Sequence, residues 1–77
     1  MPTILKGGGF RIVIYPNDHN PPHVHVVGPD KFAKVEIGAA TKVVSNMGFS
    51  AAEMRRALDL IEIHRDELLT AWRQLHG

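Results

Sequence analysis

The hydrophobic pattern changes its period near the middle of the chain. Up to about residue 46, apolar and polar residues alternate in short runs that glycine, proline and asparagine interrupt, which is typical of β-strands. From Ser50 onward, apolar residues recur every three to four positions, which predicts a helix. The pattern predicts an α+β fold: an antiparallel meander sheet of three to four strands in residues 1–46, packed on one long C-terminal helix over residues 50–76.

Turn signals separate the candidate strands. The Gly7-Gly8-Gly9 run suits a tight hairpin, and Pro16-Asn17-Asp18 ends a strand because proline cannot donate to a β-ladder. Short connections favour antiparallel pairing of consecutive strands. The candidate strands are residues 3–5, 10–15, 23–27 and 32–37, with residues 41–45 as a further candidate.

The helix is predicted from its start signal and its apolar stripe. Ser50 and Glu53 have the spacing of a capping box, and no residue breaks the helix before Gly77. A helix of about 26 residues is roughly 39 Å long, so its last turns are expected to overhang a small sheet. Leu60 and Ile63 point away from the stripe, so a partner chain or a second copy is a candidate cover for them. The stripe predicted to pack on the sheet is Met54, Ala57, Leu58, Ile61, Leu68, Trp72 and Leu75.

Strand alternation divides the side chains between two faces of the predicted sheet. One face, which the helix is expected to bury, carries Phe10, Ile12, Ile14, Val24, Val26, Ala33, Val35 and Ile37. The other face is expected to be uncovered and carries Arg11, Val13, Tyr15, His23, His25, Val27, Lys34 and Glu36.

Three histidines fall within seven residues, at positions 19, 23 and 25. His23 and His25 are two apart on one strand, so both imidazoles project the same way, and together with His19 they form a candidate metal site, for example for zinc. Asp18 is an alternative third ligand. Without a metal, His23 and His25 are candidate general acid and base groups for phosphodiester chemistry. A third alternative makes the same residues part of a protein interface or of the turn structure.

Basic and aromatic side chains beside the histidines suit a phosphate-bearing ligand, because Arg and Lys neutralise phosphates and Tyr stacks on a base. The candidate binding residues are Arg11, Tyr15, Asn17, Asp18, His19 and Lys34. The alternative to such a site is a solvated sheet face with mixed charges.

Composition sets further bounds. The chain has 77 residues, a net charge of +1 and no cysteine, which predicts one small domain without disulfides or thiolate zinc ligands. Absence of cysteine fits the cytosol. No apolar run approaches the roughly 18 residues of a membrane helix, so the expected location is cytoplasmic, without a membrane partner.

The run Asn17-Asp18-His19-Asn20-Pro21-Pro22-His23-Val24-His25-Val26, the opening Met1-Pro2-Thr3-Ile4 and the ending from His64 to Trp72 resemble domain-of-unknown-function family 4160, a family of small prokaryotic proteins. Members are often encoded beside another small protein, an arrangement similar to toxin–antitoxin pairs. The resemblance implies a cognate small protein partner, with RNA or DNA as a further target. The rival hypothesis is a histidine-dependent enzyme, either a metal-assisted hydrolase or a metal-free ribonuclease. Self-association through the helix is a third hypothesis.

Overall fold

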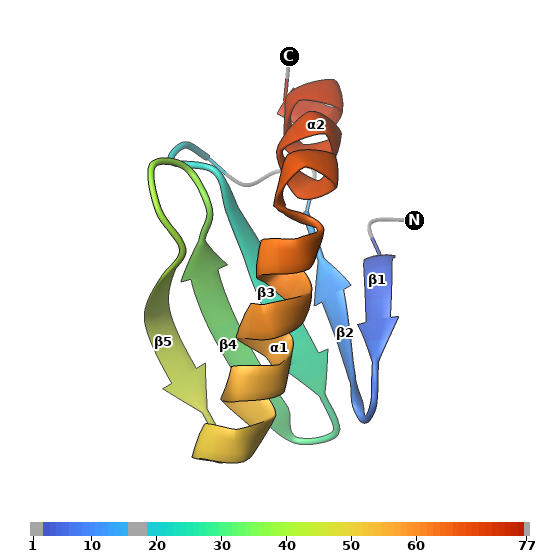
Figure 1. Cartoon of the computed structure of the whole chain (residues 1–77), viewed down its shortest axis with the longest axis vertical. Helices are drawn as coiled ribbons and strands as arrows, with labels where there is room; N and C mark the ends of the chain where they lie inside the picture. Colours follow the sequence, from blue (N-terminus) through green and yellow to red (C-terminus); the bar gives the residue numbers. More distant parts are fainter. Residues whose placement is uncertain (1–2, 16–18, 77) are drawn as a thin grey trace.

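The computed structural model describes residues 3–15 and 19–76, which form a sheet followed by two helices. All five strands pair antiparallel in sequence order, and Figure 1 shows α1 lying across one face of the sheet. The α+β class and the meander topology are confirmed. The elements are β1 (Thr3–Gly7), β2 (Phe10–Val13), β3 (His23–Gly28), β4 (Lys31–Glu36), β5 (Lys42–Met47), α1 (Ala51–Ile63) and α2 (Arg65–His76).

The predicted count of three to four strands is too low, because both edges of the sheet carry a strand with a weak local pattern. β5 is exposed along its whole length, so its side chains show no clear alternation between buried and exposed positions. Its pairing also shifts, because Ser45 lies opposite Lys34 while Val43 lies opposite Val35. Val44 is therefore the extra residue of a β-bulge, a feature that is common in edge strands.

The predicted buried face is confirmed in full. Its eight side chains belong to the main core, and seven of them are completely inaccessible to solvent. Alternation was a reliable guide here because a shift of one residue would place each of these apolar side chains on the other face.

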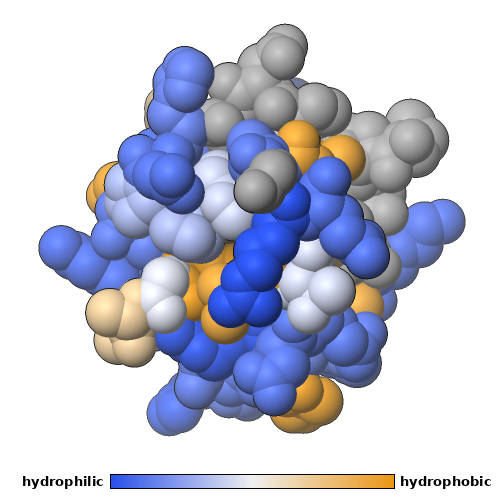
Figure 2. All heavy atoms as spheres, turned by 90° about the horizontal axis from the view of Figure 1, so that it is seen from above, coloured by the Kyte–Doolittle hydropathy of each residue, from blue (hydrophilic) through white to orange (hydrophobic). Residues whose placement is uncertain are grey.

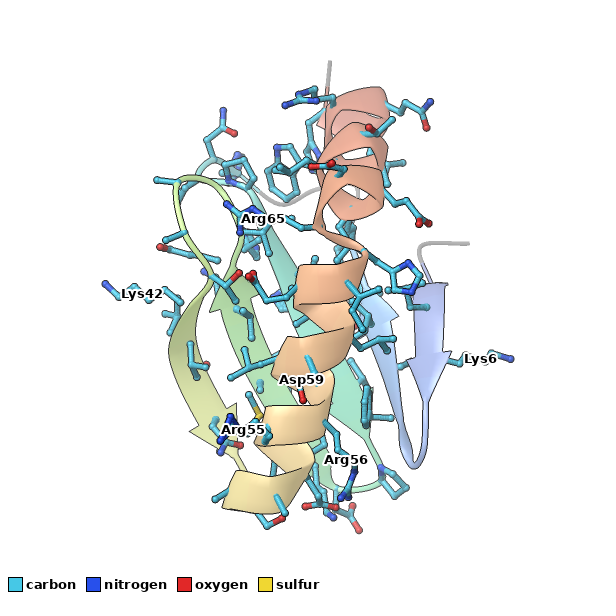
Figure 3. The ribbon with its side chains drawn as sticks, viewed as in Figure 1. Lys6, Lys42, Arg55, Arg56, Asp59 and Arg65 are labelled. Carbon is cyan, nitrogen blue, oxygen red and sulfur yellow. The ribbon has the colours of Figure 1, made fainter. Side chains whose placement is uncertain are left out.

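The predicted single long helix is wrong, because a break at His64 divides it into α1 and α2. The backbone at His64 has φ −106° and ψ 19°, outside the helical range, although the Leu68 amide still donates to the His64 carbonyl at 2.9 Å. Directly after the break, the Arg65 guanidinium donates to the Gly38 carbonyl at 2.7 Å and to the Thr41 hydroxyl at 2.9 Å. Arg65 thus ties the start of α2 to the β4–β5 loop, toward which it extends in Figure 3.

Most of the predicted helical stripe packs on the sheet. Leu58 is half-buried against the core, whereas Leu75 is 41% exposed, because the last turns of α2 rise beyond the sheet (Figure 1). Leu60 was expected to point away, but it is half-buried against the core, whereas Ile63 is 75% exposed. The stripe residues buried in the core are Met54, Ala57, Ile61, Leu68 and Trp72.

The predicted capping box is present at the start of α1. Ser50 Oγ accepts from the Glu53 amide, and Glu53 Oε1 accepts from the Ser50 amide at 2.8 Å. The Lys31 ammonium donates to the other carboxylate oxygen of Glu53 at 2.7 Å. These bonds lower the pKa of Glu53 to about 2, the hydrogen bond from Lys31 having the largest effect. Glu53 therefore connects β4 to the first turn of α1.

The end of the molecule at which α2 finishes presents a mainly hydrophilic surface. Figure 2 looks down on this end, where the hydrophobic areas are small and separated by hydrophilic residues. Neither described helix is long and apolar enough to cross a membrane.

Candidate functional site

Aromatic rings gather on the face of the sheet opposite α1. His25 on β3 lies between the rings of Tyr15 and Phe32, at centroid distances of 4.9 Å and 5.1 Å. The Phe32 and His25 planes differ by only 28°, so these rings stack. We call this surface the ring face and define it by Tyr15, His23, His25 and Phe32, with Arg11, Lys34 and Met47 as its flanking residues.

The register of the strands places the flanking residues on this face. Lys34 is the cross-strand partner of His25, and Met47 is the partner of Phe32. Directly opposed residues point to the same face of a sheet. Arg11 lies two residues before Val13, the partner of His25, and so shares the face by alternation. Arg11 is exposed and Lys34 is half-buried.

His23 connects the ring face to α2. Its ring meets His25 edge to face at 5.1 Å and lies 5.1 Å from the ring of Trp72. Its Nδ1 is 2.9 Å from the Pro21 carbonyl oxygen, and because a carbonyl only accepts, Nδ1 carries the proton of this bond. The bond fixes the orientation of the ring.

The row of rings continues along α2. Trp72 stacks on His76 with a centroid distance of 3.8 Å and an interplanar angle of 22°. His76 Nδ1 donates to the Trp72 carbonyl at 2.9 Å, which holds the imidazole against its own helix. Trp72 was predicted to be a core anchor, and its 4% exposure confirms this.

The predicted exposure of the two strand histidines is wrong. They do lie opposite the helix-covered face, but His23 is 4% and His25 is 7% exposed. Neighbouring rings account for this burial: Tyr15 and Phe32 flank His25, while Trp72 packs on His23 from α2. What the ring face offers to solvent is instead Tyr15 at 37%, Phe32 at 40% and Met47 at 71%.

The predicted metal ligands are not assembled in the described part of the chain. Within residues 3–15 and 19–76, no group of three or more His, Cys, Asp or Glu side chains is placed to hold a metal ion. The described residues include the predicted ligands His19, His23 and His25, and His19 is exposed. Asn17 and Asp18, the other predicted loop residues, lie outside the described residues.

Sequence reasoning missed two exposed residues of the ring face. Phe32 directly precedes the alternating core residues Ala33 and Val35, so alternation alone would have placed it opposite the core. Met47 was left outside the candidate strand 41–45, and only its pairing with Phe32 shows which face it joins.

The family described as Domain of unknown function (DUF4160) matches residues 9–73, a span that includes all of the ring face. No curated protein and no solved structure matches the chain.

Proposed function

This chain belongs to the family described as Domain of unknown function (DUF4160), and from that premise we propose that it is a binding component of a two-protein, toxin–antitoxin-like module. We propose that a cognate small protein docks on the ring face. The family description assigns no activity, so the proposal depends on the chemistry of that surface and on the paired gene arrangement that the resemblance implies.

The exposed rings of Tyr15 and Phe32 are the observation that carries the proposal. With Met47 they form an apolar surface on the side of the sheet that α1 leaves uncovered. Aromatic residues, methionine and arginine are enriched at protein interfaces, and Arg11 lies on the same face. Beneath them, buried His25 stacks on Phe32 and meets Tyr15 at a tilt, and both contacts limit rotation of the exposed rings. A surface already held in place loses little side-chain entropy on binding.

Co-purification tests this proposal. The untagged chain is co-expressed with the tagged product of the adjacent small reading frame, and a stable complex is expected. Phe32→Ser is expected to weaken binding by about tenfold or more, because it removes a central aromatic anchor. Leu75→Ser is the matched control, since Leu75 is exposed to a similar degree, 41% against 40%, but lies on α2 away from the ring face. No complex, or a complex that tolerates Phe32→Ser, would reject the proposal.

RNA is a second candidate ligand, which the two exposed rings favour. Aromatic side chains on a sheet surface stack on unpaired bases. Arg11 and Lys34 lie on the same face, where their charges can neutralise phosphates. The half-buried carboxylate of Glu36 lies on the same face and opposes such binding. Fluorescence anisotropy with a labelled single-stranded oligonucleotide measures the affinity for RNA at low and at physiological salt, and so separates an RNA ligand from a protein partner. RNA binding requires an affinity that falls steeply with salt and is lost in Tyr15→Ala.

The enzyme alternative draws less support from the structure. A phosphodiester must reach both imidazoles for acid–base catalysis, yet neighbouring rings cover His23 and His25. A metal-assisted hydrolase further requires a bound ion. We therefore expect metal analysis of the tagless protein to find less than one equivalent of zinc, nickel or manganese. Stoichiometric metal that is lost in His25→Ala would favour the enzyme instead.

A further inference from the structure

A hollow lies on the other side of the sheet, between the β1–β2 hairpin and α1. It measures about 350 Å³, and its apolar lining includes Phe10 and Leu60. Gly7 and Gly8 line the hairpin side, where they add backbone but no side chain. The hollow therefore has an apolar lining, and the 75% exposed side chain of Ile63 lies beside it.

Three charged residues line the hollow, namely the cations Lys6 and Arg56 and the anion Asp59. Arg56 and Asp59 both line it, and both are exposed. Within residues 3–15 and 19–76, no ion pair joins either of them to an opposite charge. Figure 3 shows the two side chains leaving α1 in different directions, Asp59 toward the viewer and Arg56 toward the lower end of the sheet. Each charge is therefore available to an external group.

We propose that this hollow binds a second copy of the chain, in a two-fold symmetric dimer that packs α1 against α1. A two-fold interface uses the same patch on both subunits, so the patch must contain complementary halves. This one does: an exposed isoleucine beside an apolar depression, and a cation beside an anion. Ile63 of each copy enters the hollow of the other, and Arg56 of one copy faces Asp59 of the second.

The charge pattern selects a second copy over an unrelated partner. A wholly acidic segment would meet Asp59, and a wholly basic one would meet Lys6 and Arg56, so neither is complementary to all three charges. The same patch turned by a two-fold axis places Arg56 of each copy against Asp59 of the other. The surface lies on the α1 side of the sheet, so a dimer formed here leaves the ring face open, and this proposal stands apart from the proposed function.

Equilibrium sedimentation of the tagless full chain tests the dimer over a range of concentrations. The expected result is a reversible monomer–dimer equilibrium. Ile63→Glu is expected to weaken the dimer by about tenfold or more, because it would place a carboxylate in the apolar hollow. A chain that stays monomeric up to about 0.5 mM, where even small weak interfaces associate, would overturn the proposal.

Charge exchange tests the two-fold geometry itself. Arg56→Asp and Asp59→Arg each set like charges against each other across the axis, so each alone is expected to weaken the dimer about three- to tenfold. Combining them restores opposite charges and is expected to recover most of the affinity. Arg55→Asp, at the neighbouring exposed arginine outside the hollow, is the control. A dimer that is unaffected by the single variants, or is not recovered in the double variant, would overturn the proposal.

Filling the hollow gives a test that leaves the monomer intact. A Cβ atom added at Gly8 meets no other atom within 4 Å, and Gly8 lines the hollow, so we expect the folded chain to tolerate Gly8→Leu and the new side chain to obstruct the hollow. The variant is expected to keep its circular dichroism and melting temperature while losing dimerisation. A folded Gly8→Leu variant with wild-type dimer affinity would contradict the assigned surface.

Discussion

Glu53 forms hydrogen bonds with both the sheet and the start of α1. Its two carboxylate oxygens accept from the Ser50 amide at the start of α1 and from the Lys31 ammonium on β4. Both bonds favour the ionised form, which is why the pKa of this carboxyl lies at about 2 rather than 4.5. One half-buried side chain thus joins the sheet to the helix that covers it.

A pH dependence follows from this lowered pKa. Glu53 stabilises the fold above pH 4.5, and its contribution declines as the pH falls toward 2, where the folded state also takes up the proton. Glu53→Gln should therefore lower the free energy of unfolding at pH 7 but have little effect near pH 2. Urea unfolding at pH 7, 4 and 2 measures this difference. An equal pH-dependent loss in Asp66→Asn would show that the effect is not local to Glu53.

Two neighbouring glycines are predicted to differ sharply in their tolerance of a methyl group. A Cβ at Gly7 would lie 2.3 Å from the end of the Phe10 ring, which is itself held in the core, whereas a Cβ at Gly8 meets nothing within 4 Å. Gly7→Ala is expected to cost about 1–3 kcal/mol of stability through this overlap. Gly8→Ala is expected to change stability by less than about 0.5 kcal/mol. Urea denaturation of both variants checks the contrast.

At the scale of elements, the placement of α2 depends on contacts near its two ends. Arg65 binds the Gly38 carbonyl and Thr41 next to the break at His64, and Thr41 in turn donates to the Glu62 carboxylate on α1. Further along, Trp72 packs between His23 and His76. The helix therefore covers the start of β3 and contributes to the burial of His23.

Loss of Arg65 should loosen α2 more than it affects the sheet. Arg65→Ala removes two charge-assisted hydrogen bonds, each worth about 1–3 kcal/mol. Amide hydrogen exchange in residues 65–76 is expected to accelerate, while exchange in β3 and β4 changes little. Arg73→Ala, an exposed arginine on the same helix, is the control and should leave the exchange pattern unchanged. Uniform acceleration across the sheet would contradict a local tether.

At the scale of the whole molecule, stability depends on a small core. A domain of this size is expected to unfold with about 4–12 kcal/mol. The core rests on a few large side chains that have no solvent exposure, namely Ile12, Ile14, Ile37, Ile61 and Leu68. Loss of any one of them removes a large fraction of the total.

Two isoleucines on α1 provide a matched test of this dependence. Ile61 is 0% exposed and Ile63 is 75% exposed. Ile61→Ala is expected to cost about 2–5 kcal/mol, since it leaves a cavity under the helix. Ile63→Ala is expected to cost less than about 0.5 kcal/mol at concentrations where the chain is monomeric. Similar losses in both variants would contradict the packing of α1.

Local patterns determined much of this protein. Alternation in the strands assigned all eight apolar residues of the covered face, and the Ser50–Glu53 spacing located the start of α1. Both signals arise within a few residues along the chain, so the sequence contains them directly. The signature run and the ending were also enough to indicate the family, which the match over residues 9–73 confirmed.

Tertiary contacts decided the rest. Alternation put His23 and His25 on the face opposite α1, but only the packing of Trp72, Tyr15 and Phe32 around them determined that they are buried. The break at His64 and the hollow beside Ile63 likewise depend on groups distant in sequence, such as the Gly38 carbonyl and the β1–β2 hairpin. Periodicity tells which way a side chain points, whereas its exposure depends on what the rest of the chain places over it.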